Sequence, residues 1–185
     1  MSILRSLAHR NFRLFFIGQG LSLIGTWMQT TAMAWLVNRL TAPPGSNEGS
    51  PFWLTMIVFA NQIPGLVLGP FSGVVADRFR RRPILCITQS LMMLQAFVLA
   101  WLAYVGIIQV WHLLILGLLL GVVSTFDVTT RQAFLTHMVG GQENLANAIA
   151  LNSSLFNGAR LVGPALAGAM LGFGVSEGTC FLLNG

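Results

Sequence analysis

The longest stretch of the chain without a formal charge, residues 83–126, limits the possible folds more than any other feature. It contains no Asp, Glu, Lys or Arg. Its length of about 44 residues fits two membrane-spanning helices of about 20 residues each, joined by a tight turn at residues 106–109. Across the chain 55% of residues are hydrophobic and 8% are charged, whereas a soluble domain has about 25% charged residues. The chain is therefore expected to be an all-α integral membrane protein.

The segment just before this stretch, residues 73–82, is strongly basic. It contains four arginines and one aspartate, in a chain with 10 basic residues, 5 acidic residues and no lysine. Short arginine-rich loops stay on the cytoplasmic side of a membrane, so this segment is expected to form a cytoplasmic hairpin between two spans. The first 13 residues contain three arginines and no acid, which predicts a cytoplasmic amino terminus for the same reason.

These landmarks arrange the chain as one transmembrane bundle over residues 1–185. The expected spans cover about residues 14–38, 53–76, 83–104, 111–131 and 146–174, and a sixth begins over residues 179–185. The last ten residues would cover about 15 Å as a helix, which is half of the hydrocarbon thickness of a bilayer. We therefore expect five complete spans, the start of a sixth, and a longer parent chain.

Arg160 is the most unusual of the polar residues inside these spans. It falls near the middle of the fifth span, where an arginine costs about 2.5–3.5 kcal/mol on insertion scales and is expected to face protein or water. The amides of Gln29, Asn61 and Gln62 also lie at membrane depth. All four residues are candidates for a substrate path, and hydrogen bonding between packed helices is the structural alternative.

Glycine and proline recur in the second and fifth spans at positions that permit close helix packing or a bend. Small residues at four-residue intervals let two backbones approach each other, and a proline removes one helical hydrogen bond. The candidates for this role are Gly65, Gly69, Gly163, Pro164 and Gly168, and in the fourth span Gly117 and Gly121 form a similar face.

Asp127 and Arg131 stand near the inner end of the fourth span. The acid precedes the base by four residues, which is the favourable order for an ion pair on one helix face. We predict a structural pair at the membrane boundary.

The remaining polar residues give no catalytic or metal-binding pattern. His9, His112 and His137 are dispersed over both expected sides of the membrane, and Cys86 and Cys180 lie at opposite ends of the expected bundle. The net charge of +5 comes from arginines at helix ends, not from a basic face that follows nucleic-acid phosphates. No enzymatic activity, metal, cofactor or nucleic-acid partner is expected.

The basic hairpin resembles a signature of the major facilitator superfamily of transporters. In that family the loop between the second and third helices follows the pattern Gly-x-Leu-Ala-Asp-Arg-x-Gly-Arg-Arg/Lys-x-x-Leu. The sequence matches it at Gly73, Ala76, Asp77, Arg78, Arg81, Arg82 and Leu85, with Val75 as a near match. Arg80 departs from the pattern, because the family has glycine at that position.

A second resemblance lies in the fifth span. The run Asn157-Gly158-Ala159-Arg160-x-x-Gly163-Pro164-Ala165-x-Ala167-Gly168 is similar to the helix 5 signature of drug and siderophore exporters, especially the enterobactin exporter branch. The run Arg131-Gln132-Ala133-Phe134 resembles the same branch. Many proton-coupled members also carry an arginine within helix 4, and the uncharged run through Phe126 lacks it, so that proton-relay role is not carried over.

The resemblance implies the amino-terminal half of a twelve-helix secondary transporter in the cell inner (plasma) membrane. Such a protein would export a small amphiphilic molecule, siderophore-like or drug-like, by alternating access. The implied partners are the lipid bilayer, the small-molecule substrate, protons as the coupling ion, and the missing carboxy-terminal half of the same transporter. The gating residues that it implies for the cytoplasmic loop are Gly73, Asp77, Arg78, Arg81 and Arg82.

Two other classes of function are alternatives to a transporter. A membrane scaffold or accessory protein without transport of its own is the main alternative, and a membrane enzyme is the third. Six further spans beyond Gly185 would favour a transporter, whereas a soluble domain would favour the others.

Overall fold

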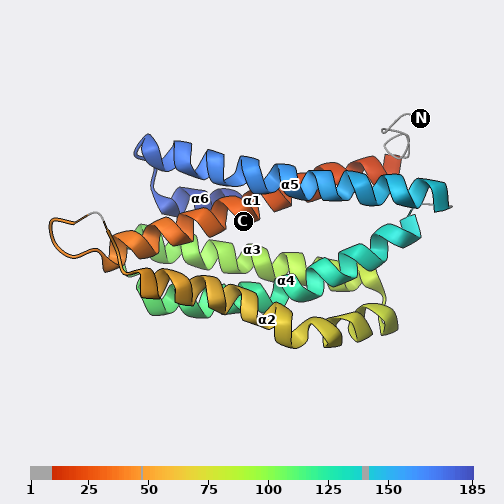
Figure 1. Ribbon diagram of the computed structural model, residues 1–185, viewed down its shortest axis with the longest axis horizontal. Coiled ribbons are helices and arrows are strands. Elements are labelled where there is room, and N and C mark those ends of the chain that lie inside the picture. The colour runs from red at the N-terminus through yellow and green to blue at the C-terminus, as the bar shows by residue number, and fades with distance from the viewer. Residues whose placement is uncertain (1–9, 47, 139–141) are drawn as a thin grey trace.

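The chain forms a bundle of long helices (Figure 1). The computed structural model describes residues 10–46, 48–138 and 142–185, and these ranges contain no strand. The helices are α1 (Arg10–Thr41), α2 (Pro51–Arg78), α3 (Arg81–Val105), α4 (Val110–Met138), α5 (Gln142–Gly172) and α6 (Glu177–Asn184). The predicted all-α class is confirmed.

Among the described residues, three segments are long and apolar enough to cross a membrane, as judged by length and composition: Pro51–Arg78, Arg81–Val105 and Val110–Leu135. Of the five complete spans predicted from the sequence, these three meet that criterion. α1 and α5 are longer, with 32 and 31 residues, but they carry amide and hydroxyl side chains that lower their hydropathy. Several of those side chains bond to neighbouring helices, which is how polar groups are accommodated at membrane depth.

Most helices extend beyond the apolar spans expected from the sequence. α4 continues to Met138, past the expected end near residue 131, and α1 already begins at Arg10. Arginine, glutamine and leucine all favour helix, so a helix continues where the apolar stretch ends. The fifth helix also begins earlier than expected, at Gln142, but it ends earlier than expected, at Gly172, and Gly174 then adopts a left-handed conformation with φ +82°.

The predicted turn at residues 106–109 is confirmed. α3 ends at Val105, and Gly106 caps it in the left-handed conformation with φ 76°. Glycine reaches this region without the steric penalty of a Cβ, so the turn can be tight.

The helices pack in two related groups. α1 lies along α5 and α6, whereas α4 lies along α2 and α3, and α3 also contacts α6. Each helix of the first group corresponds to the helix three places away in the chain: α1 to α4, α5 to α2 and α6 to α3. This correspondence is the pattern of an internal repeat. Figure 1 shows α5 and α2 on opposite sides of the bundle.

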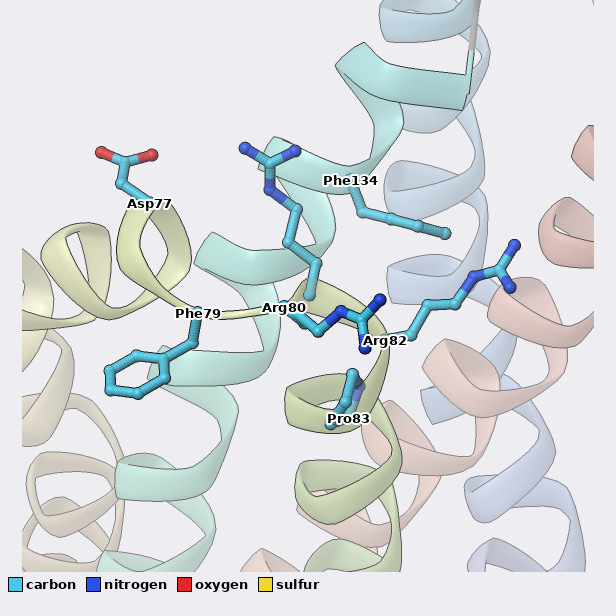
Figure 2. Close-up of a pocket in the computed structure, with 7 residues that line it drawn as sticks. Asp77, Phe79, Arg80, Arg82, Pro83 and Phe134 are labelled. Carbon is cyan, nitrogen blue, oxygen red and sulfur yellow. The ribbon is translucent and has the colours of Figure 1, made fainter.

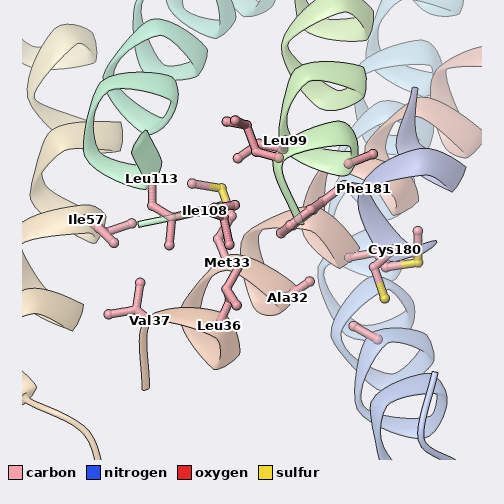
Figure 3. Close-up of a cluster of buried hydrophobic side chains, with 14 residues drawn as sticks. Ala32, Met33, Leu36, Val37, Ile57, Leu99, Ile108, Leu113, Cys180 and Phe181 are labelled. Atoms are coloured by element: carbon pink, nitrogen blue, oxygen red, sulfur yellow. The ribbon is translucent and has the colours of Figure 1, made fainter. Parts of the chain in front are cut away.

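The largest hydrophobic cluster lies toward the end of the bundle that holds the α1–α2 and α3–α4 connections (Figure 3). Its largest fully buried side chains include Leu36, Leu99, Leu113 and Phe181, which come from four helices. A smaller cluster near the opposite end contains Leu135, Ala148 and Leu151, with Phe15 and Phe16 packed against it. We call that opposite end, where α2 turns into α3, the hairpin end.

Candidate functional site

The basic hairpin is the connection between α2 and α3. α2 ends at Arg78 and α3 begins at Arg81, so Phe79 and Arg80 make the turn. Their backbones are extended, with φ −110° at Phe79 and φ −65° at Arg80. Because φ is negative at position 80, the turn does not require glycine there, and arginine fits without backbone strain.

A hollow of about 690 Å³ opens beside this turn (Figure 2). The residues that line it are Asp77, Phe79, Arg80, Arg81, Arg82, Pro83 and Phe134. Phe134 belongs to α4 and packs edge-on against Phe15 of α1, with 6.0 Å between the ring centroids. The hollow therefore brings together three of the predicted gating residues, whereas Gly73 and Arg78 are not among those that line it.

The charges of the hairpin are not balanced within the described part of the chain. Asp77 and the four arginines at positions 78, 80, 81 and 82 form no ion pair within 4.0 Å there. Figure 2 shows the Asp77 carboxylate directed away from Arg82. Four guanidinium groups against one carboxylate give residues 73–82 a net charge of +3.

Arg160 is exposed on α5, where its guanidinium contacts an aromatic ring. The guanidinium carbon lies 5.6 Å from the centre of the Trp27 ring on α1. Trp27 in turn packs edge-on against Phe156, with 5.8 Å between centroids. Arg160 has no ion pair among the described residues, and a cation over an exposed ring gains only about 0.5–1 kcal/mol. The ring orients the guanidinium but leaves its charge uncompensated.

Gln29 is fully buried and belongs to a chain of hydrogen bonds that links four helices. Its Nε2 donates to Gln95 Oε1 on α3 at 2.9 Å, and its Oε1 accepts from Asn184 Nδ2 on α6 at 2.7 Å. Gln95 Nε2 donates in turn to the backbone oxygen of Leu116 on α4 at 3.2 Å. In this conformation Gln29 serves helix packing, the alternative left open by the sequence, and does not line an open path.

The other two amide candidates lie on α2. Asn61 is half-buried and donates from Nδ2 to the backbone oxygen of Gly117 on α4, at 3.4 Å. Gln62 is exposed. Gln62 and Arg160 stand at similar depths, about 17 and 18 Å from the α2 and α5 ends farthest from the hairpin, at about 1.5 Å per residue.

Two glycines mark close contacts between helix backbones. A Cβ placed on Gly163 of α5 would lie 2.6 Å from Trp27 Cβ and 2.8 Å from the backbone oxygen of Ile24, both on α1. A Cβ placed on Gly121 of α4 would meet the backbone carbonyl group of Asn61 on α2, 2.9 Å from its carbon. These glycines let α5 approach α1 and α4 approach α2.

The other packing candidates have more space. A Cβ on Gly65 would meet only Thr125 Oγ1, at 3.7 Å, and one on Gly69 or Gly168 would meet no atom within 4 Å. The packing role expected of Gly69 and Gly168 is therefore not seen between helices of the described chain. Pro164 is half-buried, and α5 continues through it to Gly172.

A buried carboxylate is the centre of a polar cluster at the hairpin end. Asp127 is 2% exposed and pairs with Arg131, as the sequence predicted. The Thr88 hydroxyl and the Gln89 amide of α3 donate to Asp127 Oδ1 at 2.8 and 2.9 Å. Gln89 also accepts a hydrogen bond from Ser22 of α1 at 3.2 Å. Thr88 and Gln89 were not predicted from the sequence as partners of Asp127, and their only signal was that they are adjacent polar residues within an apolar run.

Within the described residues, no group of three or more His, Cys, Asp or Glu side chains could hold a metal ion. Cys86 is exposed, Cys180 is buried, and both are free thiols.

The chain matches one family model almost from end to end. That model is described as transmembrane secretion effector, within the major facilitator superfamily (MFS_3), and it covers residues 1–184. The chain belongs to this superfamily. Membership and the three apolar helices make it a multi-pass membrane protein of a transporter family.

Two curated relatives of this superfamily member come from bacteria. One is an uncharacterized MFS-type transporter, YfiS, of Bacillus subtilis, 24% identical over 83% of this chain and 34% of the relative. Another is the staphyloferrin A transporter of Staphylococcus aureus, 28% identical over 85% of this chain and 38% of the relative. The chain thus spans little more than a third of the length of these relatives. No solved structure matches it significantly.

Proposed function

We propose that the chain is the amino-terminal bundle of a secondary active transporter. The transporter exports a small amphiphilic molecule, siderophore-like or drug-like, by alternating access in the plasma membrane, with its amino terminus in the cytoplasm and with protons as the coupling ion. The main support for a transport function is the family match across residues 1–184. The name of one relative, staphyloferrin A transporter, supports a small-molecule cargo.

In this proposal a second bundle from the rest of the parent protein completes the substrate path. Secondary transporters of this type bind substrate near the bilayer midplane, between their repeated halves. Arg160 supports such a site, because it is exposed at mid-depth on α5 and has only a ring contact from Trp27. Its guanidinium would attract an anionic group of the cargo or pair with an acid of the second bundle.

The hairpin supplies the gate in this scheme. Asp77, Arg78, Arg81 and Arg82 would pair with the second bundle while the cytoplasmic side is closed, and Gly73 would allow that bundle to approach α2. The absence of ion pairs for these charged residues within the described chain supports this role. A membrane scaffold would need the arginines to set its orientation, but orientation does not require Asp77.

Transport by inside-out vesicles that contain the full-length parent protein tests the proposal. With an acidic lumen, we expect wild-type vesicles to accumulate staphyloferrin A, which serves as the anionic probe. Arg160→Ala should lower accumulation by at least about tenfold, because a hydrogen bond to a charged group contributes about 1.5–3 kcal/mol. Arg160→Lys keeps the charge but loses the planar fork, so an intermediate loss is expected.

Leu161→Ala is the matched control, since Leu161 is the adjacent exposed residue on α5. Ethidium, a cationic probe, separates cargo binding from general damage, because losing Arg160 should not impair transport of a cation. If wild-type vesicles accumulate neither probe, the proposed cargo classes are wrong. If Arg160→Ala lowers thermal stability while staphyloferrin A transport continues at the wild-type rate, Arg160 is structural.

A further inference from the structure

We propose that the hollow at the α2–α3 turn binds the phosphate group of an anionic phospholipid. Arg80, Arg81 and Arg82 line it, and none of them forms an ion pair within the described chain. Asp77 is the one acid that lines it, and Figure 2 shows its carboxylate directed away from Arg82. A singly charged phosphodiester would supply the negative charge that this group of arginines lacks.

The start of α3 adds backbone donors to the same place. The helix begins at Arg81, its first turn contains no acid, and the residue before it, Arg80, makes no capping hydrogen bond with its side chain. The amino end of a helix carries a partial positive charge and free N–H groups, so it favours an anion and disfavours arginine. An anion among the three consecutive arginines at this end would offset their unfavourable interaction with the helix dipole, which is small for each exposed charge.

Arg81 provides a separate sign of a missing acceptor. Its Nε is buried and has no hydrogen-bond partner. A buried donor without an acceptor is destabilising, more so when the group is charged. Because protein atoms cover this Nε in the present conformation, the Arg81 guanidinium would turn toward the hollow for a phosphate oxygen to accept from it.

The surface of α3 below the hollow favours a lipid over a soluble anion. Pro83, which lines the hollow, is followed on the same helix face by Ile87, Leu91 and Leu94. These three apolar side chains are 59%, 41% and 58% exposed. The face from Pro83 to Leu94 is about 16 Å long at about 1.5 Å per residue, so acyl chains can lie along it while the headgroup remains at the arginines. Free phosphate would need no such apolar surface.

Binding to the purified full-length protein in non-ionic detergent tests this inference without any transport measurement. Native mass spectrometry would compare dioleoyl phosphatidylglycerol, dioleoyl phosphatidylcholine and inorganic phosphate. We expect phosphatidylglycerol to bind at least about tenfold more tightly than phosphatidylcholine. Arg81→Gln should weaken phosphatidylglycerol binding about tenfold, and Arg81→Lys should weaken it less, because lysine keeps the charge but has no Nε.

Arg78→Gln is the matched control, because Arg78 is exposed on the same hairpin and does not line the hollow. It should change phosphatidylglycerol affinity by less than about twofold.

An equal loss of affinity in Arg78→Gln and Arg81→Gln would overturn the site in favour of diffuse electrostatic attraction. Inorganic phosphate binding as tightly as the lipid would overturn the lipid as the ligand. No preference over phosphatidylcholine would mean that an acid elsewhere in the parent protein occupies the arginines, and would also overturn the inference. If Arg81→Gln fails to fold, Arg82→Gln takes its place.

Discussion

Asp77 carries a charge that membrane orientation does not require, because the positive-inside rule depends on basic residues. It is exposed at the end of α2 and has no ion pair in the described chain. We expect Asp77→Asn to lower efflux by the full-length protein at least about tenfold, through loss of a charged hydrogen bond in the closed gate. Membrane insertion should stay normal, because no arginine is changed.

Glu48→Gln is the control for Asp77→Asn, since Glu48 is an exposed acid in the α1–α2 loop at the other end of the bundle. It should leave efflux unchanged. Normal efflux by well-inserted Asp77→Asn protein would remove the gating role of this carboxylate.

The polar residues differ in how far the sequence could predict their partners. The pairing of Asp127 with Arg131 followed from their spacing on one helix, where geometry is fixed by the helical repeat. The bonds from Thr88 and Gln89 to Asp127, and the burial of Gln29 against Gln95, depend on how each helix is rotated toward its neighbour. Spacing within one helix does not determine that rotation, so these contacts were not predictable.

At the scale of helices, three of the expected spans meet the criterion of length and composition, but the helices that contain them end at other residues than the expected spans do. Hydropathy marks where the chain leaves lipid, whereas a helix ends where its backbone hydrogen bonds end. Glycine spacing also did not distinguish a glycine that packs closely against another helix from one that does not. Gly121 and Gly69 each belong to a four-residue glycine repeat, but only Gly121 faces another helix of this chain at close range.

Gly121→Ala tests the close approach of α4 to α2. The added Cβ would meet the Asn61 carbonyl group and lie 3.0 Å from Pro64 Cγ, so the two backbones must separate. Overpacking of this kind costs about 1–3 kcal/mol, which should lower the thermal unfolding midpoint in detergent.

Gly117→Ala is the matched control one turn away on α4. A Cβ at Gly117 would meet Met33 Cε at 3.5 Å and Ile57 O at 4.0 Å, which are ordinary contacts. Alanine favours helix over glycine by about 1 kcal/mol, so this variant should be as stable as wild type or more stable. Equal unfolding midpoints for the two variants would contradict the close approach inferred at Gly121.

At the scale of the whole molecule, the order of spans was predictable but their arrangement was not. Apolar length and the basic hairpin predicted which segments cross the membrane. The pairing of α1 with α5 and of α4 with α2 joins helices that are not consecutive in the chain, and it depends on contacts that hydropathy does not encode. The resemblance to the major facilitator superfamily supplied the class of bundle, and the family match confirms it.

The orientation of the bundle in the membrane remains a prediction from charge. The α1–α2 loop and the α2–α3 hairpin lie at opposite ends of α2, and only the hairpin is rich in arginine, so the hairpin should be cytoplasmic. In full-length protein with Cys86 and Cys180 replaced by serine and alanine, a cysteine at Ser46 should react with an impermeant maleimide added to intact cells. A cysteine at Phe79, which is 63% exposed, should react only after the cells are permeabilised. Labelling of Phe79→Cys in intact cells, with Ser46→Cys protected until permeabilisation, would reverse the orientation. That result would place the arginine-rich hollow on the outer surface and the proposed gate on the wrong side for a cytoplasmic closure.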